Sequence, residues 1–128
     1  MISLELPLDT DAPAKARAAL EPLRGSLPRQ EFGDLRLLVT ELIVDDLRSH
    51  QAGDSAPIRL RADVRDETLR LELAEGWTET TPAPARPQPG ELGWGLYLAN
   101  VLADRWGLDD GEPDTLLWLE KRVGPAED

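Results

Sequence analysis

The clearest pattern in the chain is an alternation of apolar and polar residues in two neighbouring segments. Over 58–65, apolar residues alternate mainly with arginines, and over 69–73, leucines alternate with an arginine and a glutamate. A period of two is typical of a strand with one buried face. Asp66 and Glu67 lie between the two runs and are expected to form the turn. We therefore expect an antiparallel hairpin whose apolar side is covered by helices.

Weaker strand patterns lie near both ends of the chain. Apolar residues alternate with polar ones from Ile2 to Leu8, and Pro7 indicates an edge position because proline cannot donate to a ladder. A last strand is expected over 114–122. We predict one domain over 1–123, followed by a tail at 124–128 that frays.

Three segments have the apolar spacing of helices. The first begins after Thr10 or Asp11, either of which can cap it, and ends near Gly25. The second covers about 30–50, and the third runs from Leu96 to about Trp106. Residues 51–56 are expected to form a loop.

A long segment, 76–90, has no periodicity and contains four prolines. Such a composition favours neither ladder nor helix. Long loops inside compact domains are often lids over a site, so we predict a proline-rich lid; a merely tolerated insertion is the alternative.

Within the second helix, Glu41 and Asp45 are four residues apart and share one side, along the flank of an apolar band. They predict either two ordinary carboxylates on a solvated face or the acidic wall of a pocket. Two glycines, Gly93 and Gly95, directly precede the third helix. Glycines there allow backbone N–H groups to approach an anion, although this signal alone is weak.

Composition narrows the chemistry. The net charge of −11, from 25 acidic and 14 basic residues, argues against nucleic acid or an anionic membrane and favours a basic protein partner. The chain has no cysteine and one histidine, His50, which excludes thiolate and multi-histidine metal sites. We expect His50 to be exposed at a helix end. With neither a signal segment nor a membrane-spanning apolar stretch, a cytoplasmic location is predicted.

The order strand, helix, acidic helix, hairpin, loop, glycine turn, helix, strand resembles that of the anti-sigma-factor serine kinases of the histidine-kinase-like ATPase superfamily. The likeness covers nearly the whole chain and extends to the segment 103–107. It implies an α+β fold, a two-layer α/β sandwich with helices on one face of a mixed, largely antiparallel sheet (the Bergerat fold). It also implies ATP and Mg²⁺ as ligands.

The resemblance implies a role for each matching residue. Glu41 takes the place of the general base, and Asp45 stands where the family has an asparagine that coordinates magnesium. Arg48 is the basic residue closest to this pair along the helix. The remaining matches are to the phosphate-cradling box, namely Gly93, Gly95 and Leu96, and to the adenine site, namely Gly76 and Thr115.

Several positions depart from the family pattern. Ala74 stands where an aspartate accepts a hydrogen bond from adenine, a loss of about 1.5–3 kcal/mol. Glu75 is expected to point to the opposite face of the strand. Asp45 adds negative charge beside a triphosphate. Asp46 falls within the apolar band, where a carboxylate must find an arginine, reach solvent or become protonated.

These departures favour a pseudokinase: a bacterial regulator that acts by protein–protein sequestration, with ATP binding weakened or lost. Its expected partner is a sigma factor, an anti-sigma factor antagonist or a second copy of the chain. The alternative is an active Mg-ATP-dependent kinase in which Glu41 takes the proton of a serine or threonine of the antagonist. A third interpretation is an unrelated small α/β domain. From the sequence, Ala74→Asp is expected to recover measurable ATP affinity if the rest of the pocket is intact.

Overall fold

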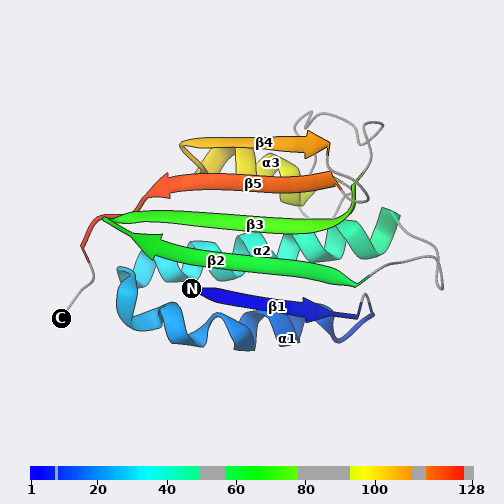
Figure 1. Cartoon of the computed structure of the whole chain (residues 1–128), viewed down its shortest axis with the longest axis horizontal. Helices are drawn as coiled ribbons and strands as arrows, with labels where there is room; N and C mark the ends of the chain where they lie inside the picture. Colours follow the sequence, from blue (N-terminus) through cyan, green and yellow to red (C-terminus); the bar gives the residue numbers. More distant parts are fainter. Residues whose placement is uncertain (8, 50–56, 78–92, 111–114, 126–128) are drawn as a thin grey trace.

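The computed structural model describes residues 1–7, 9–49, 57–77, 93–110 and 115–125 (Figure 1). Its elements, in chain order, are β1 (Ile2–Leu6), α1 (Ala12–Ala19), the 3₁₀ helix η1 (Glu21–Ser26), α2 (Arg29–Ser49), β2 (Ile58–Arg65), β3 (Thr68–Trp77), α3 (Trp94–Leu102), β4 (Arg105–Asp110) and β5 (Thr115–Arg122).

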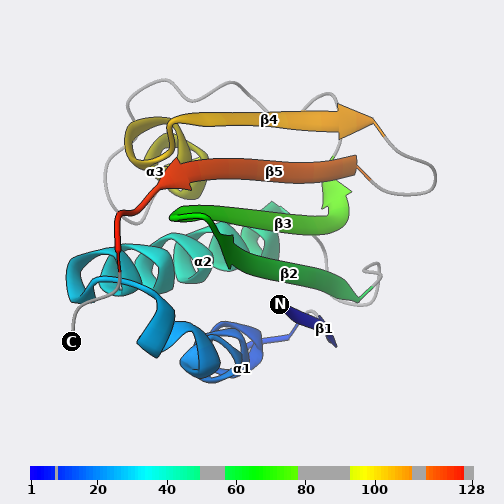
Figure 2. The same cartoon turned by 60° about the vertical axis from the view of Figure 1, so that its left-hand side comes forward.

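The five strands form one sheet in the order β1-β2-β3-β5-β4, and all four pairings are antiparallel. The helices lie on one face of this sheet, as Figure 2 shows. The predicted two-layer α+β class is therefore confirmed, with a sheet that is antiparallel at every described pairing. β1 is an edge strand, as Pro7 indicated.

The hairpin follows the predicted register. Val64 pairs with Leu69 and Arg65 with Thr68, which leaves Asp66 and Glu67 as a two-residue turn. Both turn residues have positive φ, 51° and 60°. Two left-handed residues give the turn a twist that matches the twist of the flanking strands, so the hairpin closes without an extra residue.

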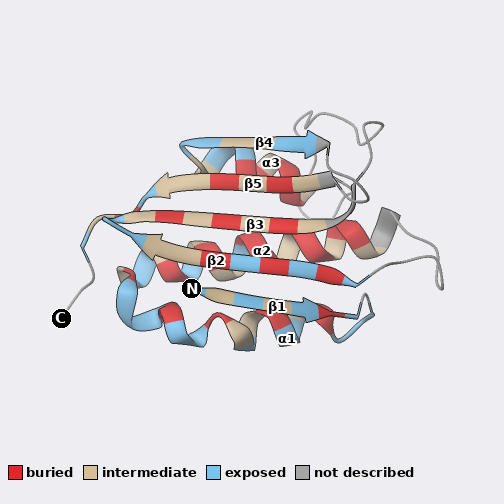
Figure 3. Cartoon of the chain, in the orientation of Figure 1, coloured by how far each residue is buried: buried red, intermediate tan, exposed pale blue. Residues whose placement is uncertain are grey.

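The core lies between the sheet and the helices, and buried positions alternate along the central strands in Figure 3. A continuous apolar band on α2 packs against the leucines of β3 and β5 in this core. Burying one such side chain contributes about 1.5–3 kcal/mol. The main contributors are Leu35, Leu38, Val39, Leu42, Ile43, Leu60, Leu71, Leu73, Leu117 and Leu119.

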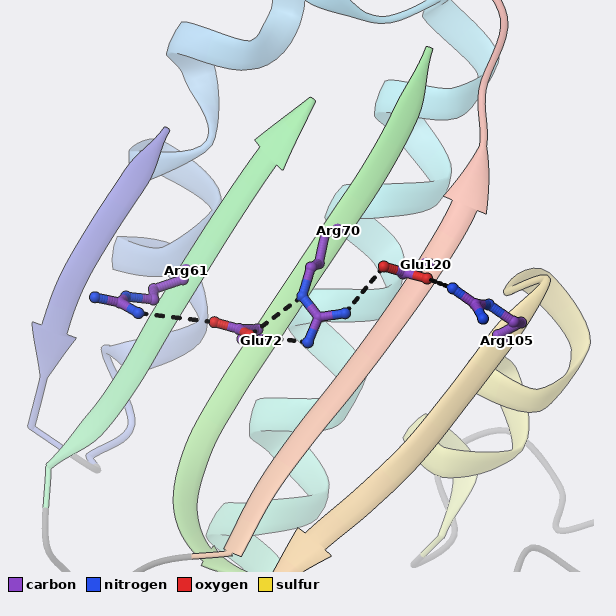
Figure 4. A network of polar contacts seen from close by, with 5 residues as sticks. All are labelled: Arg61, Arg70, Glu72, Arg105 and Glu120. Carbon is purple, nitrogen blue, oxygen red and sulfur yellow. Dashed lines mark hydrogen bonds and ion pairs between the residues drawn. The ribbon is translucent and has the colours of Figure 1, made fainter. Parts of the chain in front are cut away.

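The other sheet face carries a row of ion pairs (Figure 4). Arg70 bonds to Glu72 and to Glu120, each at 3.0 Å, and Arg61 lies 3.9 Å from Glu72. Arg105 on β4 also donates to Glu120. The hydrogen bonds from Arg105 and Arg70 hold the pKa of Glu120 below its usual range.

The first predicted helix is divided in two. α1 ends at Ala19, and Glu21 begins the 3₁₀ helix. Pro22 explains the break, since proline disfavours an α conformation in the preceding residue and cannot donate to the ladder. Asp11 is the N-cap by position, but it makes no side-chain cap bond; instead Asp9 Oδ1 accepts the Asp11 N–H at 2.9 Å.

The third predicted helix is too long. α3 ends at Leu102, Ala103 is extended, and Trp106 belongs to β4, an edge strand. Trp106 and Leu108 pair with Leu119 and Leu117, so the end of the supposed helix is a strand with period two.

β3 extends to Trp77, so Gly76 and Trp77 are strand residues and not part of the loop. The predictions for 51–56, for 78–90 and for His50 fall outside the described residues. Within the described part of the chain, no helix combines the length and the apolar character needed to cross a membrane.

Candidate functional site

The first turn of α3 lies directly against the middle of α2. A Cβ atom at Gly95 would be 2.8 Å from the carbonyl carbon and oxygen of Glu41 and from Cα of Leu42. These are backbone atoms of a buried helix and have no room to yield, so only glycine allows this approach. The structure therefore places the backbone of Glu41 directly against Gly95.

Asp45 joins the two helices by hydrogen bonds. Its Oδ1 accepts the backbone N–H of Gly93 at 3.1 Å, and its Oδ2 accepts that of Gly95 at 2.7 Å. The side chain is 3% exposed. The Asp45 side chain thus satisfies free N–H groups at the N-terminus of α3 from another helix, and it places a negative charge at the positive end of the α3 dipole.

Gly93 makes this arrangement possible. It is the N-cap residue of α3 and has φ +92°, a conformation that glycine adopts without steric cost. Leu96, the next member of the predicted phosphate box, is 2% exposed and belongs to the core. Because the Leu96 side chain is buried in the core, the groups of the box that can meet an anion are the backbone N–H groups of Gly93 and Gly95, and both donate to Asp45.

This geometry does not fit a nucleotide phosphate as it stands. The N–H groups predicted to cradle phosphate already donate to a buried carboxylate, and an incoming phosphate would meet that negative charge. Among residues 1–7, 9–49, 57–77, 93–110 and 115–125, no group of three or more acidic or histidine side chains is placed to hold a metal.

The structure does not bring Ala74 to this site. Ala74 pairs with Arg59 on β2 and with Leu116 on β5, and it lines one surface hollow together with Arg59 and Glu72, on the sheet face away from the helices. Directly opposed residues of antiparallel strands share a face. Leu73, between Glu72 and Ala74, faces the core instead. Ala74, which the resemblance matches to an adenine-binding aspartate, therefore lies on the sheet face away from the helices.

Four further positions singled out from the sequence are described only in part. Thr115 and Gly76 are register partners at an irregularity between β3 and β5, which brings the two predicted adenine-site residues side by side along the backbone. The side chains of Arg48, Glu75 and Thr115 lie outside the described part of the structure.

Sequence reasoning missed two features beside the site. Arg17 of α1 donates to Thr40 Oγ1 at 3.1 Å, so a guanidinium from a separate helix reaches the residue before Glu41. Trp94 and Tyr97 stack with ring centroids 5.5 Å apart on the first turns of α3. Their i, i+3 spacing in a predicted helix could have indicated this contact, since residues three apart on a helix are neighbours. Asp46, flagged from the sequence, is fully buried on α2.

The comparisons with known proteins agree with this architecture. The structure of the RsbU and RsbW domains of Rv1364c from Mycobacterium tuberculosis is similar, with a TM-score of 0.67 and 19% identity over 98% of this chain. The match covers 33% of that longer chain and is a likeness of fold. No curated protein sequence matches. The model of the histidine kinase-like ATPase domain matches residues 6–121, which is most of the sequence, and the chain belongs to this family.

Proposed function

We propose that this chain is a bacterial regulatory protein of the anti-sigma factor/serine-kinase type that acts by sequestering a protein partner, with ATP binding weakened or lost. The partner class is a sigma factor or an anti-sigma factor antagonist. One observation carries the proposal: both oxygens of Asp45 accept the N–H groups that a phosphate would need. The fold it shares with a structure containing an RsbW domain supports the choice of regulatory class.

The energetic argument is a competition between two anions for one helix end. Hydrogen bonds to a charged group contribute about 1.5–3 kcal/mol each, and Asp45 makes two of them to α3. A phosphate that displaced Asp45 would also leave a buried carboxylate beside it. Each 1.4 kcal/mol of this penalty lowers affinity about tenfold, so loss of several decades is expected.

An active Mg-ATP-dependent protein serine/threonine kinase is the second candidate. It is favoured by the direct contact between Gly95 and the backbone of Glu41, which would hold a general base next to a phosphate-binding turn. The two candidates differ in whether Asp45 leaves the glycine turn when nucleotide is offered.

Calorimetry with Mg-ATP distinguishes them. We expect no heat of binding for the wild-type chain at sub-millimolar nucleotide. Asp45→Asn removes the competing charge and should produce measurable binding. Asp109→Asn is the matched control, because it removes the same charge from an exposed position on β4. Tight wild-type binding, together with transfer of the γ-phosphate to a protein serine or threonine, would support the kinase instead.

A second variant tests the geometry of the adenine side. Ala74→Asp restores the family residue by sequence, but its carboxylate would lie on the sheet face that carries Arg59 and Glu72. We therefore expect no gain in ATP affinity from this variant, alone or combined with Asp45→Asn. A gain in the single variant would mean that β3 can present position 74 to the helix side.

Sequestration itself requires a nucleotide-independent complex. The chain should retain the same protein from native cytoplasm with and without added Mg-ATP, and the retained protein should be a sigma factor or an antagonist of the anti-sigma class. Retention only in the presence of Mg-ATP would contradict the proposal, because partner binding would then depend on an occupied nucleotide site.

A further inference from the structure

The outer face of α3 is unusual for this chain. Charged residues make up 30% of the sequence, yet the nine residues of α3, WGLYLANVL, include none. Its inner side is buried, as expected for a core helix. Trp94, Tyr97 and Val101 follow one another at i, i+3 and i+7; Trp94 and Tyr97 are partly buried, Trp94 packs against the core, and Val101 is 56% exposed. An exposed helix side normally carries polar residues, so an apolar stripe there marks a contact surface.

β4 continues this apolar surface. Trp106 and Leu108 pair with the buried residues Leu119 and Leu117 and therefore face the helix side of the sheet. Leu108 is 36% exposed. Trp106 Nε1 donates to Asn100 Oδ1 of α3 at 3.1 Å, which fixes the helix beside the strand. We define the α3–β4 face as Trp94, Tyr97, Val101, Trp106 and Leu108.

The α3–β4 face borders a strand edge. β4 is the last strand of the sheet, and no strand in the described part of the chain pairs with its outer side. An edge strand offers backbone N–H and C=O groups to an added strand, and aromatic side chains next to it supply pockets for alternate residues. Partly exposed tryptophan and tyrosine are the side chains that most often dominate binding interfaces.

Charge selects the type of occupant. The chain carries a net charge of −11; Asp109 is exposed on β4, and Asp104, also exposed, lies just before the strand and accepts the Arg122 N–H. The nearby cation, Arg105, is bonded to Glu120. A second copy of the chain would bring a like charge, whereas a basic segment would be attracted.

We infer that the α3–β4 face binds an extended basic segment of a partner protein, which pairs along the outer edge of β4 and directs alternate apolar side chains onto Trp106, Leu108 and Val101. This goes beyond the proposed function, since it requires neither a sigma factor as partner nor an empty nucleotide site.

The test uses three synthetic peptides of about eight residues, enough to pair along a strand of ordinary length. One alternates valine and lysine, one valine and glutamate, and one serine and lysine. Titration into the ¹⁵N-labelled chain, followed by NMR, should show the valine–lysine peptide shifting the amides of β4 and of α3. The other two peptides should bind at least about tenfold more weakly.

Two variants complete the design. Val101→Glu should weaken the valine–lysine peptide about tenfold or more, because it places a charge in the apolar contact. Leu37→Glu is the matched control: Leu37 is a 47% exposed apolar residue on α2, and its substitution should leave binding unchanged. Unchanged melting temperatures in both variants show that each is folded.

Several results would overturn the inference. The first is no amide shift at β4 with the valine–lysine peptide, and the second is equal affinity for the serine–lysine peptide, which would mean charge attraction alone. Equal binding by Val101→Glu would remove the apolar contact from the argument. Concentration-dependent dimerisation with shifts at the same amides would assign the face to a second copy of the chain.

Discussion

At the scale of single residues, Asp45 links α2 to α3, because its carboxylate satisfies two backbone donors of α3 from within the protein. An asparagine at this position has one acceptor oxygen and a competing donor. The two carboxylate oxygens of Asp45 therefore attach α3 to α2 through both donors.

Removing this carboxylate should lower the free energy of unfolding. We predict a loss of about 3 kcal/mol for Asp45→Ala, which leaves buried N–H groups without an acceptor, and about half as much for Asp45→Asn. Urea denaturation followed by far-UV circular dichroism measures both values. A loss below about 0.5 kcal/mol for the alanine variant would show that α3 does not depend on this cap.

Gly95 and Gly33 form a matched pair of glycines on helices. A Cβ at Gly95 would meet the α2 backbone at 2.8 Å, whereas a Cβ at Gly33 would meet nothing within 4 Å. We predict that Gly95→Ala lowers unfolding free energy by about 1–3 kcal/mol and that Gly33→Ala raises it by about 0.5–1 kcal/mol. Equal effects in urea denaturation would contradict the close helix contact.

The family resemblance, and not the spacing of single residues, implied that Glu41, Asp45 and the glycines before α3 belong to one site. The structure places the Glu41 backbone and the Asp45 carboxylate against these glycines. That Asp45 turns to Gly93 and Gly95 could not be predicted, since the two helices meet only in the folded chain. The position of Ala74 could have been: Leu69, Leu71 and Leu73 face the core, so strand alternation already placed Ala74 on the polar face.

At the scale of elements, the strands and helices with long periodic patterns were predicted within a few residues, and the errors are confined to short or mixed patterns. β4 was missed because its six residues, RWGLDD, are separated by only two residues from a helix whose apolar period can be extended to Trp106. Residues 105–110 form a strand because they pair with β5, and local periodicity does not reveal such a contact between segments.

The row of ion pairs across β2, β3, β5 and β4 predicts a pH effect. The pKa of Glu120 in the folded chain is below its ordinary value of 4.5, chiefly because of its hydrogen bond from Arg105. The stabilisation is therefore present above about pH 4.5 and is lost as pH falls through the lower folded value. Glu120→Gln should show a smaller fall in melting temperature between about pH 5 and 3 than the wild type.

Salt provides the control for this effect. At about 1 M the screening length is about 3 Å, and the difference between Glu120→Gln and the wild type should shrink. A steeper acid-side fall in the variant than in the wild type would mean that the ionised Glu120 carboxylate does not stabilise the folded chain.

At the scale of the whole molecule, the net charge of −11 acts against compactness through repulsion among 25 carboxylates. We predict that the melting temperature rises between about 10 and 200 mM sodium chloride, because screening of the net repulsion exceeds the weakening of surface ion pairs. Scanning calorimetry at fixed pH measures this. A falling melting temperature would mean that the ion pairs of the open sheet face dominate instead.

α3 is the only element, among those described, that takes part in both proposed events: Asp45 holds its first turn, and its outer stripe belongs to the α3–β4 face. An anion that displaced Asp45 and a peptide that bound to the α3–β4 face would thus both contact the same nine-residue helix. By thermodynamic linkage, if the anion changes the affinity for the peptide by some factor, the peptide must change the affinity for the anion by the same factor.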